Sequence, residues 1–164
     1  MSWLTAEDHM EIVETLYLYA RAIDAKELGL LERVFTSDAA IHYDVPGGSR
    51  LSYGELVPWL ASALAMFRMT QHVVTNPIVE VLDGRVRSAA YLTATHEQVG
   101  LDGRKTTFID HGIYKDDWLK TPGGWRIRAR RLQRFFMRGD FQVPDQCKSY
   151  PEAPAKIALQ GGDD

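Results

Sequence analysis

Apolar residues near the start of the chain recur at intervals of three and four, which is the spacing of one face of a helix. Thr5 and Asp8 stand just before them in capping-box spacing. The pattern therefore predicts a long helix that begins after Thr5 and ends near Asp24. The residues expected to face inward, including two that widen the apolar stripe, are Ile12, Val13, Leu16, Tyr17, Tyr19, Ala20 and Ile23.

Two more helices and one short strand are predicted before the middle of the chain. Apolar spacing indicates a shorter helix over residues 26–35 and a third helix over residues 53–67, with Ser52 as its N-cap. Between these helices, residues 39–45 are typical of a strand, and we expect the Pro-Gly-Gly at residues 46–48 to end it.

The second half of the chain has the alternating pattern of strands. Asp83-Gly84 is a strong signal for a two-residue hairpin between the first two of them. The four predicted strands cover residues 69–82, 85–99, 106–118 and 125–136. Helices followed by hairpin-linked strands predict an α+β fold, in which helices pack on one face of a curved antiparallel sheet. The concave face and the helices can then enclose a pocket.

Composition indicates a single domain of ordinary type. The chain has 164 residues, of which 45% are hydrophobic, and a formal net charge of −3. We expect residues 1–142 to form the domain and residues 143–164 to form a loose or docked tail. The mild acidity gives no reason to expect binding to nucleic acid or to a membrane. One cysteine, Cys147, and an acidic N-terminus without a signal-peptide pattern favour a cytoplasmic setting.

His72 is the first candidate for chemistry. It lies in the strand-like run 69–82, where alternation places it on one face with Val74 and Asn76. A histidine among apolar neighbours on a sheet face is either packed in the core or works as an acid–base group. The pattern of this segment alone favours the packed alternative.

Asp24 and His96 are the next candidates, and each has two readings. Asp24 follows Val13, Tyr17 and Ala20 at helical intervals, so it shares the inward side of the first helix, but it also stands where it could cap the second helix. His96 ends a row of small or apolar residues on one strand face. It either faces a pocket or simply ends the core.

The last two strands carry further polar candidates. Phe108 and Asp110 share one strand face, and His111 lies on the opposite face, where it would be exposed or would contact another subunit. The final strand is rich in arginine. Most of these side chains are expected at the surface, but one that reached inward, Arg130 or Arg134, could hold an oxygen of a ligand.

Other catalytic patterns are missing from the sequence. It contains no Gly-rich phosphate loop and no G-x-S-x-G elbow. His42 and Asp44 form only an isolated local pair, and no histidine spacing typical of a metal site occurs. The expected cofactor requirement is therefore none, for metals as well as for organic groups.

Four motifs together resemble the nuclear transport factor 2-like superfamily and, within it, the SnoaL-like and scytalone dehydratase-like branch. They are Leu16-Tyr17-x-Tyr19-Ala20-x-x-Ile23-Asp24, Val34-Phe35-x-x-Asp38-Ala39, Thr70-Gln71-His72 and Gly123-Gly124-Trp125-Arg126-Ile127. The resemblance covers most of the chain up to the last strand. It implies a cone-shaped α+β barrel, the cystatin-like arrangement, whose pocket holds an Asp–His pair.

The resemblance also implies roles for single residues. His72 matches the general base or acid of the dehydratases, and Asp24 matches the helix-end aspartate that orients it. His96 matches a second catalytic histidine, and Tyr43 matches a pocket tyrosine. A further pocket tyrosine of scytalone dehydratases is replaced here by Ile23.

Other positions depart from that pattern. Phe108 and Asp110 stand where scytalone dehydratases have a serine and an asparagine, so scytalone is not the expected substrate. Arg134 is similar in place to an arginine of bacterial bile acid dehydratases. The expected substrate-binding residues are Tyr19, Tyr43, Phe108, Asp110 and Arg134.

These observations predict a cofactor-free lyase of the dehydratase type that acts on a small, largely apolar cyclic hydroxy compound. An isomerase, a polyketide cyclase or a dehydrohalogenase could use the same Asp–His pair. The alternative from another class is a non-catalytic small subunit, such as that of a ring-hydroxylating oxygenase, in which Asp24 and His72 need not touch. We also expect a homo-oligomer, a dimer or a trimer, because the basic final strand and the apolar residues beside it would suit a contact between subunits.

Overall fold

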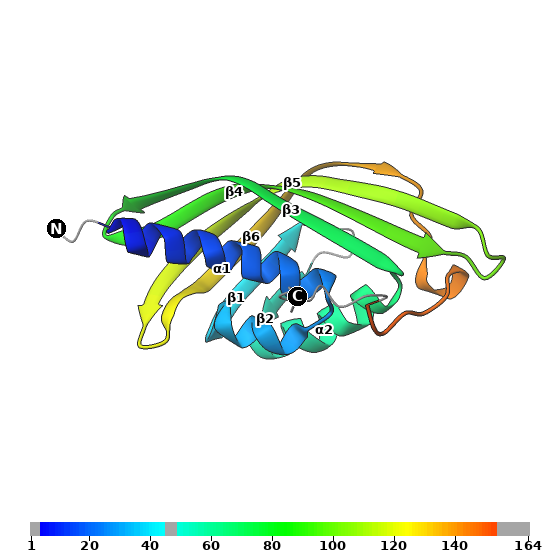
Figure 1. Cartoon of the computed structure of the whole chain (residues 1–164), viewed down its shortest axis with the longest axis horizontal. Helices are drawn as coiled ribbons and strands as arrows, with labels where there is room; N and C mark the ends of the chain where they lie inside the picture. The colour runs from blue at the N-terminus through cyan, green and yellow to red at the C-terminus, as the bar shows by residue number, and fades with distance from the viewer. Residues whose placement is uncertain (1–3, 45–48, 154–164) are drawn as a thin grey trace, which may run out of the picture.

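The computed structural model describes residues 4–44 and 49–153 as an α+β fold, as predicted. Six strands form one curved sheet in the order β2-β1-β6-β5-β4-β3, with every pairing antiparallel except the parallel pair of β1 and β6. The sheet arches over α1. The second helix, α2, lies on the same side of the sheet as α1, in the lower part of the view (Figure 1). The elements are α1 (Ala6–Asp24), the 3₁₀ helix η1 (Leu28–Arg33), β1 (Phe35–Asp44), β2 (Ser49–Ser52), α2 (Tyr53–Ala65), β3 (Met69–Leu82), β4 (Arg85–Val99), β5 (Lys105–Thr121), β6 (Gly124–Gly139) and the 3₁₀ helix η2 (Pro144–Gln146).

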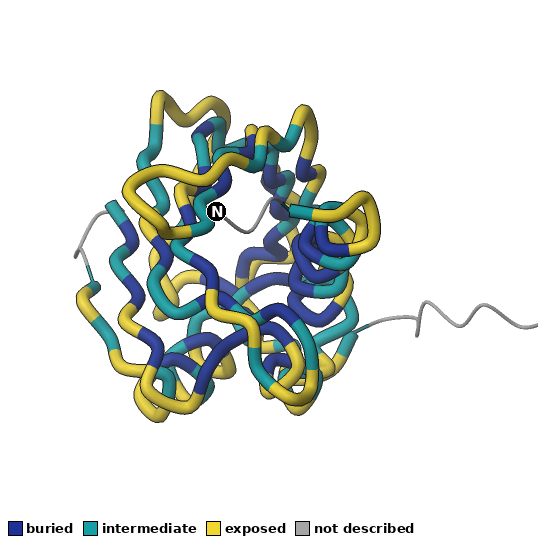
Figure 2. Tube along the Cα trace, turned by 90° about the vertical axis from the view of Figure 1, so that its left-hand side faces the viewer, coloured by how far each residue is buried: buried dark blue, intermediate teal, exposed yellow. Residues whose placement is uncertain are grey.

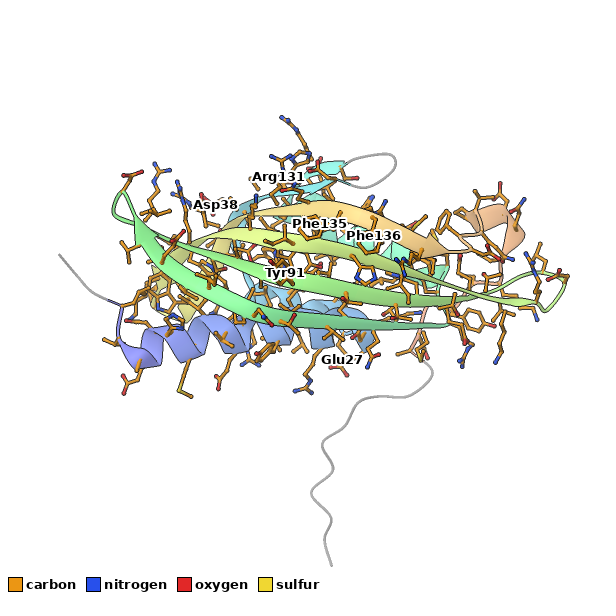
Figure 3. The ribbon with its side chains drawn as sticks, turned by 90° about the horizontal axis from the view of Figure 1, so that it is seen from above. Glu27, Asp38, Tyr91, Arg131, Phe135 and Phe136 are labelled. Carbon is orange, nitrogen blue, oxygen red and sulfur yellow. The ribbon has the colours of Figure 1, made fainter. Side chains whose placement is uncertain are left out.

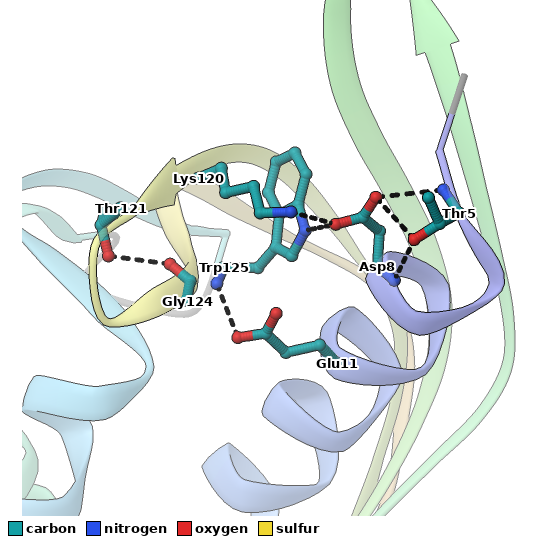
Figure 4. Close-up of polar contacts among 7 residues, drawn as sticks. All are labelled: Thr5, Asp8, Glu11, Lys120, Thr121, Gly124 and Trp125. Carbon is teal, nitrogen blue, oxygen red and sulfur yellow. Dashed lines mark hydrogen bonds and ion pairs between the residues drawn. The ribbon is translucent and has the colours of Figure 1, made fainter. Parts of the chain in front are cut away.

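The first turn of α1 is tied to the turn between β5 and β6 (Figure 4). Thr5 and Asp8 form the predicted capping box, and the Asp8 carboxylate also accepts a 2.8 Å hydrogen bond from the indole of Trp125. Glu11 accepts a hydrogen bond of 2.9 Å from the backbone of the same residue. Gly124 has φ +104°, and a Cβ there would lie 1.8 Å from the Glu11 carboxylate. Only glycine therefore lets the turn approach the helix this closely.

The inward faces agree with the predicted periodicity at most positions, and the buried residues concentrate between the sheet and the helices (Figure 2). On β4 the expected row is buried: Ser88, Ala90, Leu92, Ala94 and His96. On α1 the stripe is narrower than predicted. Tyr17 is 46% exposed, because only the face centred on Leu16 and Ile23 contacts the sheet.

The connection after α1 differs from the prediction. Residues 26–35 do not form an α-helix: the chain makes the 3₁₀ turn η1 and enters β1 at Phe35. The N-cap of η1 is Glu27, without a side-chain hydrogen bond, so the capping role considered for Asp24 is wrong. A short strand, β2, was not expected, and the turn predicted at residues 46–48 lies outside the described residues.

The long strands agree closely with their predicted ranges, and β5 and β6 extend further than expected. Residues after β6 lie against the domain as far as Tyr150, whose backbone N–H donates to the Ala65 carbonyl. Gln98, fully buried, exchanges two 2.8 Å hydrogen bonds with the backbone of Gln142. This part of the chain is therefore held against the end of the sheet.

An ion pair lies in the core beneath the centre of the sheet. Arg130 and Asp116 have fully buried side chains and make two hydrogen bonds of 2.7 and 2.8 Å. The guanidinium lies 4.3 Å from the ring centre of Tyr19 and 4.1 Å from that of Tyr114. Although burial opposes the charge, the nearby Asp116 carboxylate raises the pKa of Arg130 above its usual value. Burial raises the pKa of Asp116, whereas the guanidinium of Arg130 and its two hydrogen bonds oppose that rise. The two partners therefore depend on each other.

We predict that Asp116→Ala lowers the free energy of unfolding by about 3–5 kcal/mol, because it leaves the Arg130 charge buried and unpaired. Asp117→Ala is the matched control, since this neighbour pairs with Arg87 at the surface and should cost at most about 1 kcal/mol. Urea denaturation followed by circular dichroism measures both. Equal losses in the two variants would contradict the prediction.

Candidate active site

The last residue of α1 meets β3 through a nearly buried carboxylate. Asp24 Oδ1 lies 2.7 Å from His72 Nδ1, and Oδ2 accepts a 2.8 Å hydrogen bond from the His72 backbone N–H. The Thr70 hydroxyl donates a third hydrogen bond, of 2.9 Å, to Oδ1. The side chains of Asp24 and His72 are 10% and 9% exposed. The contact expected between these two residues is therefore present.

The carboxylate determines which nitrogen of His72 carries the proton. Asp24 is an acceptor, so Nδ1 is the N–H donor and Nε2 is left with the basic lone pair. His72 is among the residues that line the cavity under the sheet. Its ring centre lies 5.6 Å from that of His96, edge to face. The arrangement is that of a base oriented by a carboxylate.

His96 is held in an apolar slot on the next strand. Its ring is stacked on Phe108 with 4.4 Å between centres and lies 4.7 Å from Phe67. Burial, followed by the nearby His72 and Arg134, lowers the pKa of His96 to about 3. Its Nδ1 is buried and has no hydrogen-bond partner among the described residues. His96 is thus a neutral imidazole at ordinary pH and can only donate or accept a hydrogen bond.

Of the two arginines considered for the pocket, Arg134 is the one that lines it. Its Nη2 donates a 2.9 Å hydrogen bond to Asp110 Oδ2, and its Nε lies 2.8 Å from Oδ1 of the same carboxylate. Arg130 does not line this cavity, because Asp116 and two tyrosine rings enclose its guanidinium. Since Asp110 accompanies Arg134, the guanidinium adds little net charge to the cavity.

The cavity has a volume of about 300 Å³ and is walled largely by aromatic and aliphatic side chains. Tyr19 and Tyr43 contribute a pair of hydroxyl groups 2.8 Å apart. Burial raises the pKa of Tyr43 well above its usual value, so its hydroxyl keeps its proton. Of the eight residues predicted for the site, the seven that line this cavity are Tyr19, Tyr43, His72, His96, Phe108, Asp110 and Arg134.

Several positions of the site were not identified from the sequence. Thr70 lies two residues before His72 on the same strand face, and that spacing is the one signal that could have indicated it. Trp59 and Phe141 also line the cavity, from α2 and from the segment after β6, and no local pattern singles them out. Asn76, grouped with His72 by alternation, is instead exposed with φ +52° at an irregularity of β3.

Residues 4–44 and 49–153 lack two other classes of feature. Within these ranges, no group of three His, Cys, Asp or Glu side chains is arranged to hold a metal ion. No helix in the same ranges has the length and apolar character needed to cross a membrane.

Comparison with known proteins gives a consistent family match. The model of the SnoaL-like domain matches residues 4–131. The uncharacterized protein Rv2910c of Mycobacterium tuberculosis is 34% identical over 132 residues, which are 80% of this chain and 88% of the relative. The likeness to that relative therefore extends over nearly the whole described domain.

Solved structures share the fold. Kfla4162 from Kribbella flavida has a TM-score of 0.72 and 26% identity, over 80% of this chain and 93% of that one. A candidate scytalone dehydratase from Novosphingobium aromaticivorans has a TM-score of 0.70 and 18% identity, over 88% and 96%. A nuclear transport factor 2-like superfamily protein from Salmonella enterica has a TM-score of 0.64 and 18% identity, over 96% and 98%. All three share the fold of this chain, and one of them carries the name of the superfamily that the motifs resemble.

The depressed pKa of His96 predicts how stability depends on pH. In the unfolded chain the imidazole takes up a proton below about pH 6.5, whereas in the folded protein it stays neutral down to about pH 3. Stability is therefore lost as the pH falls through this window, by about 1.4 kcal/mol per pH unit from this group alone.

His96→Leu should remove that contribution. Between about pH 6 and 4 we expect its unfolding free energy to fall less steeply with pH than that of the wild type, by about 1.4 kcal/mol per unit. Urea titrations at several pH values measure the slopes. Equal slopes, or an imidazole whose NMR signal titrates near pH 6, would show that His96 is not held neutral.

Proposed function

The chain belongs to the SnoaL-like domain family, and we propose that it is a cofactor-independent lyase whose acid–base group is the Asp24–His72 pair. The observation that carries the proposal is the 2.7 Å contact between the carboxylate and Nδ1, at the edge of an apolar cavity. The substrate class is a small, largely apolar cyclic hydroxy compound. The reaction is an elimination of water.

In the proposed step, Nε2 of His72 takes a proton from an acidic C–H of the substrate. The electron pair of that bond forms the new C=C bond as the neighbouring C–O bond breaks. The departing hydroxyl takes that proton back from the His72 imidazolium and leaves as water, which restores the neutral base. Asp24 holds the ring in the required tautomer and stabilises the imidazolium that forms. General acid–base catalysis by one such group contributes roughly 10²–10⁴-fold.

The other polar groups of the cavity would position the substrate. His96, being neutral, would offer a hydrogen bond to the leaving hydroxyl without acting as an imidazolium acid. Tyr43 keeps its proton and could donate in the same way. Arg134, accompanied by Asp110, would hold a carbonyl oxygen without demanding an anionic substrate.

The non-catalytic alternative is less well supported. A binding subunit has no need for a carboxylate that orients a pocket histidine, whereas a general base requires such an orienting group. An isomerase or cyclase would use the same pair, so the product distinguishes these activities from the lyase. We also propose that the protein is soluble, lies in the cytoplasm and assembles as a homo-oligomer.

We predict that His72→Gln and Asp24→Asn lower kcat by about 10²–10⁴-fold while the fold is kept. Both changes nearly preserve side-chain volume but remove the base or the charge that orients it. A panel of cyclic β-hydroxy ketones and fused-ring alcohols, followed by ultraviolet absorbance of the new conjugated product, provides the assay. His9→Gln, on the outer part of α1, is the control and should leave turnover unchanged.

Two results would sink the lyase proposal. In the first, the wild type converts no member of the panel, while His72→Gln and Asp24→Asn only reduce stability. In the second, turnover persists in both variants within a few-fold of the wild type.

Thr70 should act as a positioning residue through Asp24. Thr70→Val keeps the shape of the side chain but removes the hydroxyl that donates to Oδ1, so we expect kcat/KM to fall about tenfold. Thr70→Ser should restore turnover, because it keeps the hydroxyl that donates to Oδ1. A purely structural role would lower the stability of Thr70→Val without lowering kcat/KM of the folded protein.

A further inference from the structure

Lys26 occupies a backbone position that usually belongs to glycine. The N–H groups of Lys26 and of the next residue donate to the Ile23 and Ala22 carbonyls, at 3.0 and 2.9 Å. These two hydrogen bonds form a Schellman motif at the end of α1, in which Lys26 has the left-handed φ of +55°. Glycine would take this conformation without strain, whereas a side chain costs free energy there. A lysine at such a position favours a use for its side chain.

The side chains of Lys26 and Glu27 leave this turn in different directions. Glu27 is exposed and lies at the edge of the molecule, beside the end of α1 (Figure 3). Lys26 is partly buried, and its Nζ donates hydrogen bonds to two backbone carbonyls, that of Phe67 at 2.8 Å and that of Tyr150. The ammonium therefore joins the end of α1 to two segments that lie 41 and 124 residues further along the chain.

Phe67 connects this ammonium to the candidate active site. Its side chain is buried and lines the cavity. Its ring centre lies 4.7 Å from that of His96 and 5.6 Å from that of Phe108, so it forms one wall of the slot that holds His96. The hydrogen bond from Lys26 to the Phe67 carbonyl thus fixes the backbone from which this wall extends.

The end of α1 contacts the short stretch of residues 67–72 in two places. The Asp24 carboxylate accepts hydrogen bonds from Thr70 and His72. The Lys26 ammonium, two residues later, donates to the Phe67 carbonyl. A single contact would let the helix end tilt, whereas two contacts fix its direction. The direction matters, because a displacement of about 1 Å in a catalytic arrangement can lower the rate severely.

Tyr150 adds a third segment to this contact. Its backbone N–H donates to the Ala65 carbonyl at the end of α2, at 2.6 Å, and its own carbonyl accepts from Lys26. The backbone of one residue thus contacts the ends of both helices. A side chain without N–H donors in place of Lys26 would leave the Phe67 and Tyr150 carbonyls without this partner.

We propose that Lys26 is a positioning residue of the candidate active site. Its ammonium fixes the end of α1 against residues 67–72, and this holds the Asp24 carboxylate on Nδ1 of His72. The effect on turnover rests on the function proposed above. The effect on the hydrogen bond between Asp24 and His72 does not, so it is measured separately and without a substrate.

The main test follows the proton NMR signal of the His72 Nδ1–H, which a short hydrogen bond to a carboxylate moves far downfield. Labelling with ¹⁵N-histidine and loss of the signal in His72→Gln assign it. Lys26→Met keeps the length of the side chain and the strained backbone but removes the donors, so the signal should move upfield and broaden. Lys26→Arg should restore it, because a guanidinium can donate to two carbonyls.

Lys26→Gly separates the side chain from the backbone. Glycine relieves the strain at φ +55°, so a lysine that served only as part of the turn would give a variant with an unchanged signal. We expect instead the same change as in Lys26→Met, together with faster hydrogen exchange in peptides that contain Tyr150. Lys115→Met is the matched control. This exposed lysine donates to the Gln133 side chain, and its loss should leave the signal in place.

Turnover gives a second measurement on the same variants. With a substrate that the wild type converts, kcat of Lys26→Met should fall about tenfold while KM changes less than about twofold, because the contacts of the substrate in the cavity remain. Lys26→Arg should recover most of the loss. A purely structural role would lower the stability of Lys26→Met without lowering kcat of the folded protein.

The proposal fails if folded Lys26→Met and Lys26→Gly keep the wild-type signal, even when both melt early. It also fails if Lys115→Met changes the signal to the same extent, or if the wild type shows no such signal. Should Lys26→Met not fold, Lys26→Gln takes its place, since its shorter side chain cannot reach both carbonyls and should give the same upfield shift. A wild type that converts no substrate contradicts the lyase proposal and leaves the NMR result, and with it this inference, intact.

Discussion

The buried carboxylate of Asp24 is held inside this fold by three hydrogen bonds from β3. It stands at the C-terminal end of α1, where the helix dipole disfavours a negative group, and it is nearly buried. Thr70 and His72 provide the compensating donors, and no other contact in the described structure replaces them. The contacts that orient the imidazole therefore also fix the position of α1 against β3.

The opposite end of α1 is restrained with equal specificity. Asp8 and Glu11 accept hydrogen bonds from Trp125, and Gly124 admits the close approach of the β5–β6 turn. A helix attached at both ends cannot slide along the sheet. Precision of this kind is what a base and its orienting group require.

Charge is balanced differently in the two parts of the interior. Beneath the sheet, Arg130 and Asp116 pair with each other, and both side chains are fully buried. In the cavity, Asp110 accompanies Arg134, and burial keeps His96 neutral. The Asp24–His72 pair, whose histidine lines the same cavity, is the acid–base group of the proposed reaction.

Much of this protein could be predicted from the chain alone, because helix and strand periodicities are local properties. The limits of β3 and β4, the capping box at Thr5 and the buried row of β4 followed from spacing, and the motifs indicated Asp24 and His72 as a pair. Local pattern could not decide whether Asp24 caps a helix or faces a histidine, since a cap and a buried acceptor use the same residue type. The donors that decide it are 46 and 48 residues away.

Because periodicity is a local property, it also failed to predict two features of the structure. Periodicity assumes a regular strand, so it could not foresee that a bulge at Phe135 would place both Phe135 and Phe136 outside and Met137 at the cavity. It also gave Tyr17 an inward position, because the width of a buried stripe depends on the curvature of the sheet that packs on it. The sequence by itself determined α1, α2, the long strands and most of their buried faces, and its motifs indicated the candidate acid–base pair. Only the tertiary structure decided which polar groups meet, because burial and hydrogen bonding between distant segments exist only once the sheet has closed over α1.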